Sequence, residues 1–191
     1  MVTRSRVRSA GLGRVAQKNV RLFLGLILFV CLLGFYAYKH RTPEPETIIA
    51  GKAWIIDGDT ISISGAHIRL EGIDAPESDQ TCTDSKGAAW PCGRAATSEL
   101  RRRIGGQELT CHRRALDKYK RVLAACTLPD GSDLNAWMVR EGWALSYSFG
   151  PAYAREEAEA RAAKRGVWAG PFLPPWRWRQ GRDGGNAAIV R

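Results

Sequence analysis

Five carboxylates surround a single cation in residues 56–77, IDGDTISISGAHIRLEGIDAPE. Asp59 precedes one predicted strand and Asp74 follows the next, so a hairpin brings both side chains to the same end. Two neighbouring carboxylates repel one another, and a hard divalent cation such as Ca²⁺ relieves that repulsion. Arg69, in the second strand, is suited to bind an anion that the cation also contacts. A metal ion and an arginine around one anion indicate phosphoryl chemistry.

Ordinary explanations exist for these residues taken singly. Asp57-Gly58-Asp59 alone is typical of a hairpin turn. An EF-hand loop starting at Asp57 would need glutamate at its twelfth position, which is Ile68, so that class is excluded.

The elements that must position these residues follow from hydrophobic periodicity and turn signals. They are strands within 53–56, 60–64 and 67–71, a helix over 93–104, strands over 108–114 and 121–128, and helices over 134–141 and 153–165. Three strands, a helix and two more strands is the element order of an OB barrel. We therefore predict an α+β fold, a five-stranded OB-type barrel with about three helices.

Cysteine spacing predicts two disulfides. The relevant residues are Cys82, Cys92, Cys111 and Cys126. They contain no C-x-x-C pair, so a structural zinc site is not expected. An antiparallel hairpin centred between residues 118 and 119 places Cys111 opposite Cys126, which leaves Cys82 to pair with Cys92. Disulfides are expected of an exported domain, and four reduced, buried thiols are the alternative.

The N-terminal residues differ in composition from the rest. Residues 1–41 hold eight of the 29 Lys and Arg and no acid, whereas the remainder is nearly balanced. The net charge of +10 therefore says little about what the folded part binds. Residues 22–38 are uncharged and predict one transmembrane anchor with the N-terminus in the cytoplasm. A cleaved signal peptide is the alternative, but no convincing cleavage site follows.

This pattern divides the chain into five regions: a basic cytoplasmic stretch (1–21), the anchor (22–38), a Pro/Glu linker (39–49), the OB-fold domain (50–178) and a disordered tail (179–191). The domain is expected on the periplasmic or extracellular side of a bacterial cytoplasmic membrane. We expect a monomer without a protein partner.

The chain resembles the staphylococcal-nuclease-like (thermonuclease) family. The matching stretches are IDGDTI, IRLEGIDAPE, DKYKRVLA, LNAWMVREGWA and KRGVWAG, which occur in family order over about residues 56–170. The resemblance implies an OB-fold nuclease that uses Ca²⁺ to hydrolyse phosphodiester bonds in DNA and RNA.

The resemblance also implies a metal site and a base. Asp59, Asp74 and the backbone carbonyl of Ala75 would hold Ca²⁺. Family members often have threonine in place of Ala75, a change that a carbonyl ligand tolerates. Glu77 would orient or deprotonate the attacking water. Asp57 is expected near the metal without binding it directly.

Substrate contacts follow from the same resemblance. Arg69 and Arg121 would clamp the phosphate, and Tyr119 and Tyr147 would line a nucleotide pocket by stacking. The family usually has glycine where this chain has Lys120. If that position needs a positive φ, lysine there costs of order 1 kcal/mol and can shift Arg121. Alternatively, Lys120 adds a phosphate contact.

Two functions of other classes compete with the nuclease. One is a catalytically impaired OB module that binds nucleic acid, and the other is a tethered structural protein whose acids bind calcium for stability. The presence of all three acids and both arginines argues against catalytic decay. A merely structural calcium site leaves Arg69 and Arg121 unexplained.

Overall fold

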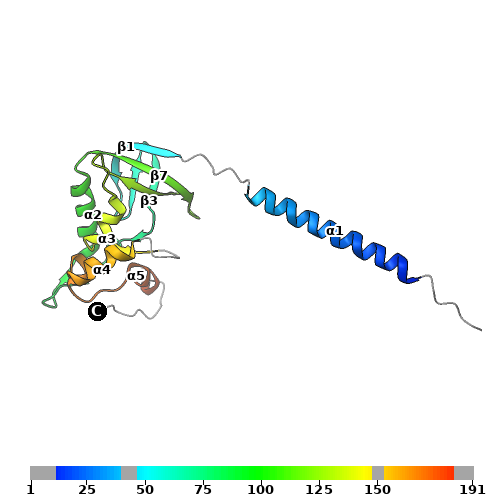
Figure 1. Ribbon diagram of the computed structural model, residues 1–191. Coiled ribbons are helices and arrows are strands. Elements are labelled where there is room, and N and C mark those ends of the chain that lie inside the picture. The colour runs from blue at the N-terminus through cyan, green and yellow to red at the C-terminus, as the bar shows by residue number, and fades with distance from the viewer. Residues whose placement is uncertain (1–11, 40–46, 148–152, 183–191) are drawn as a thin grey trace, which may run out of the picture. The chain divides into compact units, whose positions relative to one another are not determined.

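The computed structural model describes residues 12–39, 47–147 and 153–182. The chain divides into two units, Met1–Pro45 and Glu46–Arg191, which we describe separately (Figure 1).

The part of the first unit that the structure describes is one helix, α1, over Leu12–Lys39. It covers the predicted anchor, and its large apolar side chains between Phe23 and Tyr36 are exposed. Within the described residues, no helix has both the length and the apolar character that crossing a membrane requires. The predicted linker falls mostly on residues 40–46, outside the described residues.

The second unit is built on a closed five-stranded barrel, in which neighbours follow the order β1-β2-β3-β8-β7. Its strands are β1 (Ile48–Ile55), β2 (Thr60–Ile63), β3 (Ala66–Leu70), β7 (Glu108–Leu116) and β8 (Val122–Thr127). β3 and β8 run parallel, and the other neighbours are antiparallel. The predicted α+β class and five-stranded barrel are confirmed.

Alternation of side chains explains the β2–β3 hairpin. Ile61 pairs with Ile68 in the register, and both are fully buried in the barrel core together with Ile63 and Leu70. The same register pairs Thr60 with Arg69, which fixes Arg69 beside the residue that precedes β2. The apolar pattern thus sets the register of the hairpin, and the register determines the position of Arg69.

Helices pack on the barrel in the second unit (Figure 1). They are α2 (Cys92–Ile104), α3 (Leu134–Arg140), α4 (Ala154–Ala162), the 3₁₀ helix η1 (Gly166–Ala169) and α5 (Pro175–Arg182). Gly105 ends α2 in the left-handed conformation, at φ 56°. The Asp133 side chain caps α3 by accepting from the backbone N–H of Ala136.

The predicted helix count was too low, because α5 was missed. α5 begins with Pro175 at its first position and runs through Arg182, beyond the boundary expected at residue 178. The glycines that follow gave this end of the chain the composition of a disordered segment. Residues 183–191 of the predicted tail lie outside the described residues.

Both predicted disulfides are present, Cys82–Cys92 and Cys111–Cys126. Cys111 lies opposite Cys126 in the β7–β8 register, as the hairpin centre predicted. The register shifts by one residue between Arg113 and Ala115, a bulge that the sequence pattern did not reveal.

A second, smaller core surrounds the Cys82–Cys92 disulfide. Val167, Trp168 and Phe172 pack there, with the Trp168 and Phe172 rings edge to face at 5.0 Å between centroids. Two short sheets border this core and the barrel, β4 (Ile73–Asp74) with β9 (Leu145–Ser146) and β5 (Cys82–Thr83) with β6 (Ala89–Trp90). This second core ties the C-terminal segment to the loop that follows Glu77.

Candidate active site

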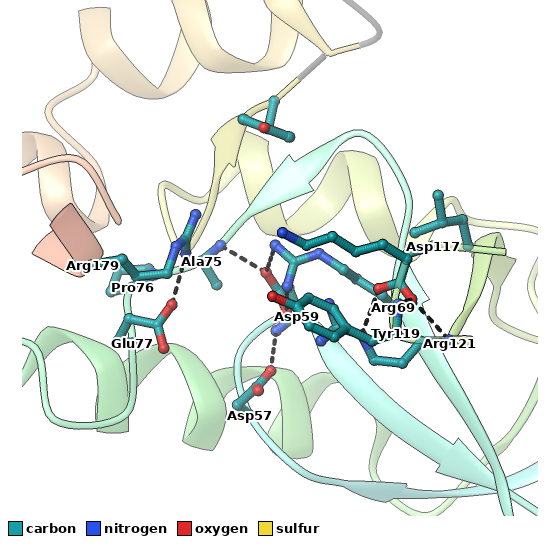
Figure 2. Close-up of a pocket in the computed structure, with 13 residues that line it drawn as sticks. Asp57, Asp59, Arg69, Ala75, Pro76, Glu77, Asp117, Tyr119, Arg121 and Arg179 are labelled. Atoms are coloured by element: carbon teal, nitrogen blue, oxygen red, sulfur yellow. Dashed lines mark hydrogen bonds and ion pairs between the residues drawn. The ribbon is translucent and has the colours of Figure 1, made fainter. Parts of the chain in front are cut away.

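A pocket of about 460 Å³ opens where the β2–β3 hairpin, the β7–β8 turn and α5 meet (Figure 2). Its lining is mostly charged or aromatic and consists of Asp57, Asp59, Arg69, Ala75, Pro76, Glu77, Asp117, Lys118, Tyr119, Arg121, Leu123, Tyr147 and Arg179. Nearly all the residues predicted from the sequence to form the site line this one pocket, and Asp74 and Lys120 are the exceptions.

The turn before β2 positions Asp59. The Asp59 backbone N–H donates to the Asp57 Oδ1 at 3.0 Å, so Asp57 shapes the turn. The Asp59 carboxylate then accepts from the Thr60 hydroxyl at 2.8 Å and from the Ala75 N–H at 3.3 Å. These contacts hold a buried carboxylate against the backbone of residue 75.

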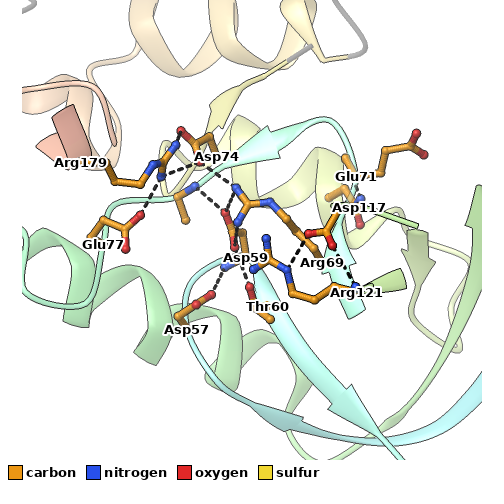
Figure 3. Close-up of polar contacts among 12 residues, drawn as sticks. Asp57, Asp59, Thr60, Arg69, Glu71, Asp74, Glu77, Asp117, Arg121 and Arg179 are labelled. Atoms are coloured by element: carbon orange, nitrogen blue, oxygen red, sulfur yellow. Dashed lines mark hydrogen bonds and ion pairs between the residues drawn. The ribbon is translucent and has the colours of Figure 1, made fainter. Parts of the chain in front are cut away.

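Arg69 joins the two buried aspartates. Its Nη2 lies 2.9 Å from Asp59 Oδ2 and 2.9 Å from Asp74 Oδ1, and its Nη1 donates to Asp59 Oδ1 at 3.1 Å. Asp74 is fully buried in β4 and therefore lies just behind the pocket wall. The structure brings together the two acids and the arginine that the hairpin argument placed at one end (Figure 3).

Burial makes this arrangement electrostatically unfavourable for the acids. Burial raises the pKa of Asp59 to about 7; the Arg69 guanidinium opposes that rise, and the Asp57 and Asp74 carboxylates add to it. The Arg69 guanidinium therefore only partly offsets the effect of burial on Asp59.

Glu77 lies on the other side of the aspartates and contacts a residue that the sequence reasoning missed. Its Oε1 accepts from Arg179 Nη1 at 2.7 Å. Arg179 comes from α5, 102 residues further along the chain. No motif linked them, and only the docking of α5 brings them together.

Close backbone packing fixes the Glu77 loop. A Cβ added to Gly93, at the start of α2, would lie 1.7 Å from the Glu77 carbonyl oxygen. Only glycine permits this approach, because every other residue would have to displace backbone atoms.

The β7–β8 turn positions Arg121. Asp117 Oδ1 accepts from the backbone N–H groups of Tyr119 and Arg121, at 2.8 and 2.9 Å, and its Oδ2 accepts from Arg121 Nε at 2.7 Å. Desolvation is the largest single influence and raises the pKa of Asp117, but the hydrogen bonds from Arg121 and Tyr119 together outweigh it and hold that pKa below its ordinary value. Asp117 was quoted in the family motif, but no role for it was predicted.

Lys120 adopts the left-handed conformation, with φ at 64°. The condition for backbone strain at this position is therefore met. Lys118, not Lys120, lines the pocket, with its Nζ 4.9 Å from the centroid of the Tyr119 ring. The Arg121 guanidinium carbon lies 5.6 Å from the same ring, so Arg121 keeps its place in the pocket wall.

The two predicted stacking tyrosines border the pocket with exposed rings. Tyr119 is 68% exposed and Tyr147 is 51% exposed. Exposed aromatic faces beside cations are suited to stack on bases.

The residues present fit a hard divalent cation. Among the described residues, no group of three or more His, Cys, Asp or Glu side chains forms a metal cluster. The donors at this site would be the carboxylates of Asp59 and Asp74 and the backbone carbonyl of Ala75. Oxygen ligands of this kind are typical of Ca²⁺. The raised pKa of Asp59 marks a place where added positive charge stabilises the ionised site.

Comparisons with known proteins agree with this fold and site. The family described as staphylococcal nuclease homologue matches residues 67–170, more than half of the chain. Relatives include a succinoglycan biosynthesis protein, ExoI, of Rhizobium meliloti, 32% identical over 87% of this chain and 89% of its own length. An uncharacterized endonuclease of Escherichia coli is 36% identical over 65% of this chain and 80% of its own. A micrococcal nuclease of Shigella flexneri is 34% identical over 66% and 77%.

The family match and the relatives named as nucleases make this chain a phosphodiester hydrolase. The chain belongs to the staphylococcal nuclease family.

Proposed function

We propose that the protein is a calcium-dependent nuclease that hydrolyses phosphodiester bonds of DNA, RNA or both. The main observation that supports this proposal is that the Arg69 guanidinium bridges the buried carboxylates of Asp59 and Asp74. Glu77 and Arg121 lie in the wall of the same pocket. This arrangement combines a place for a cation, a base and two anion-binding groups within one hydrolase fold.

The proposed roles follow from the chemistry of each group. Asp59, Asp74 and the Ala75 carbonyl would hold Ca²⁺, which when bound would supply a Lewis acid for a phosphoryl oxygen. Glu77 accepts a proton from water while the water oxygen forms its bond to phosphorus and the bond to the leaving oxygen breaks, and the leaving oxygen takes its proton from solvent. Arg69 donates to the non-bridging oxygens, where negative charge grows.

The remaining proposed substrate contacts do not depend on the base sequence of the nucleic acid. Arg121 donates beside the leaving oxygen, on the side of the pocket formed by the β7–β8 turn. Tyr119 and Tyr147 stack on bases, and every base offers a face for stacking. Lys118 adds a positive charge at the same edge, where the nucleic-acid backbone passes.

The proposed location is outside the cytoplasm. Two disulfides in the second unit support it, because such bonds persist in oxidising compartments. The tether through residues 22–38 and the monomeric state remain predictions from the sequence.

The test uses the full-length, oxidised protein with single-stranded DNA, duplex DNA and RNA, in Ca²⁺ and then in chelator. Glu77→Gln removes the base, and Glu108→Gln is the matched control, because Glu108 is exposed on β7 outside the pocket. We expect cleavage that chelation abolishes, a loss of about 10²–10⁴ in kcat for Glu77→Gln, and no change for the control.

Other outcomes would overturn this proposal. Binding without cleavage identifies an OB recognition module. Full activity of Glu77→Gln refutes the role of Glu77, and undiminished cleavage in chelator refutes the calcium requirement.

A further inference from the structure

Arg179 contacts both acids that the proposed mechanism needs. Its Nη1 and Nη2 donate to Asp74 Oδ1 and Oδ2 at 3.1 and 2.9 Å, and its Nη1 also donates to Glu77 Oε1 at 2.7 Å (Figure 3). Asp74 Oδ1 accepts from Arg69 as well. Both oxygens of a fully buried carboxylate are therefore engaged by guanidinium groups.

A network of hydrogen bonds places Arg179 there. The buried Gln80 side chain accepts from the Glu77 N–H at 3.2 Å and donates to the Leu173 carbonyl at 2.6 Å, so it links the Glu77 loop to the segment before α5. Trp178 Nε1 donates to Asp79 Oδ1 at 3.3 Å, on the same loop. Leu173 and Trp178 thus anchor α5 on the N-terminal side of Arg179, and the ion pairs are part of a built contact.

The segment that leads into α5 is fixed as well. The Thr83 N–H donates to the Pro171 carbonyl at 3.0 Å, and Phe172 lies in the core around the Cys82–Cys92 disulfide. A Cβ added to Gly170 would lie 2.2 Å from the Thr83 carbonyl oxygen, so the two backbones are in close contact. α5 therefore cannot move away from the pocket without breaking packed structure, whereas release of Arg179 requires only that its side-chain contacts with Asp74 and Glu77 break.

We propose that Arg179 is the resident counter-cation of the metal carboxylates and that Ca²⁺ must displace its guanidinium from Asp74. This inference rests on the proposed calcium site. A divalent ion bound to Asp74 takes an oxygen that Arg179 now occupies, and its charge adds to those of Arg69 and Arg179 around one carboxylate, where like charges repel one another. Contact between Arg179 and Asp74 therefore competes with binding of the ion at Asp74.

Two consequences follow from this competition. Without calcium, Arg179 compensates the buried charge and stabilises the fold around Asp74. With calcium, the ion binds only the fraction of molecules in which Arg179 has left Asp74, so the apparent affinity is reduced by that fraction. The metal-free enzyme also keeps Glu77 in an ion pair.

The experiment is a calorimetric Ca²⁺ titration of the full-length, oxidised protein, compared with Arg179→Gln and Arg177→Gln. Arg177 is the matched control, because it is an exposed arginine of the same helix whose Nη1 donates to Gln180 Oε1. We expect Arg179→Gln to tighten the Kd by about tenfold, the equivalent of one charge-assisted contact, and Arg177→Gln to leave it unchanged.

Thermal unfolding supplies a second readout. In chelator, Arg179→Gln should unfold at a lower temperature than the wild type, and the rise in Tm on adding Ca²⁺ should be larger. Arg179→Lys keeps the positive charge and the fold, but one ammonium group cannot match the paired contacts to Asp74. Its Kd should lie between those of the wild type and Arg179→Gln.

Results of three kinds would overturn the inference. An unchanged or weaker Kd in both Arg179 variants, with calcium bound by the wild type, refutes the displacement and leaves the nuclease proposal intact. An unchanged Kd with a raised KM for nucleic acid makes Arg179 a phosphate ligand instead. If neither the wild type nor the variants bind Ca²⁺, the calcium proposal itself fails.

Discussion

Replacing Lys120 with glycine tests whether the departure from the family pattern in the β7–β8 turn carries strain. Lys120 holds φ at 64°, and its N–H donates to the Asp117 carbonyl at 3.0 Å, so the turn keeps this conformation in the folded state. A left-handed conformation costs a residue with a Cβ roughly 1–2 kcal/mol. Glycine avoids that cost but loses about 0.5–1 kcal/mol more conformational entropy on folding.

The difference between these two free-energy costs favours the glycine variant by about 0.5–1 kcal/mol. This raises Tm by about 1–4 °C for a chain of this size. Thermal unfolding followed by circular dichroism measures this shift. Lys120→Ala is the matched control, because alanine removes the same side chain and keeps the Cβ. It should not reproduce the gain. A glycine variant that unfolds at or below the wild-type temperature, or an alanine variant that matches it, refutes the assignment of strain to φ.

The kinetic side of this prediction concerns Arg121. Asp117 holds Arg121 through its backbone N–H and its Nε, so the glycine variant should keep the wild-type kcat and KM on DNA. If both Lys120 variants instead raise KM equally, the lysine side chain contacts the phosphate and the alternative interpretation is correct.

Three further predictions concern the site and its support. Because folding raises the pKa of Asp59 from its ordinary 3.8 to about 7, the folded protein binds this proton more tightly than the unfolded chain. In chelator, the free energy of unfolding should therefore fall as pH rises from about 4 to about 7 and then level off, and Asp59→Asn should flatten that slope in urea titrations. Replacing Cys111 and Cys126 together by alanine should cost about 3 kcal/mol of stability in the same titrations, and an unchanged midpoint would contradict the disulfide's role. Gly93→Ala should reduce both stability and activity, since a Cβ collides with the Glu77 carbonyl; wild-type turnover would refute that close approach.

Local patterns predicted the parts of the fold that depend on neighbours in the chain. Alternating isoleucines fixed the β2–β3 hairpin, and the register of that hairpin placed Asp59 and Arg69 together. The centre of the β7–β8 hairpin likewise predicted the Cys111–Cys126 pair, because antiparallel pairing is set by position along the chain.

Contacts between distant segments could not be predicted in the same way. The ion pairs of Arg179 join residues about one hundred positions apart, and they depend on how the segment from Gly170 packs against the loop after Glu77. The helix itself has a weak signal, since it is short, rich in Trp and Arg, and contains a glycine. Only the proline at its start marks it, and a proline alone does not distinguish a helix from a turn.

The functional unit is larger than the segment that matches the family. That match covers residues 67–170, so it begins after Asp59 and ends before Arg179, although both residues line the pocket. The pairing of β2 with β3, a contact within the barrel, places Asp59 in the pocket. Arg179 is placed in the pocket by α5, whose position depends on the second core and on Gln80. The charge balance of the pocket is thus set jointly by the barrel and by a C-terminal segment outside it, and a change in either should alter how the carboxylates bind a cation.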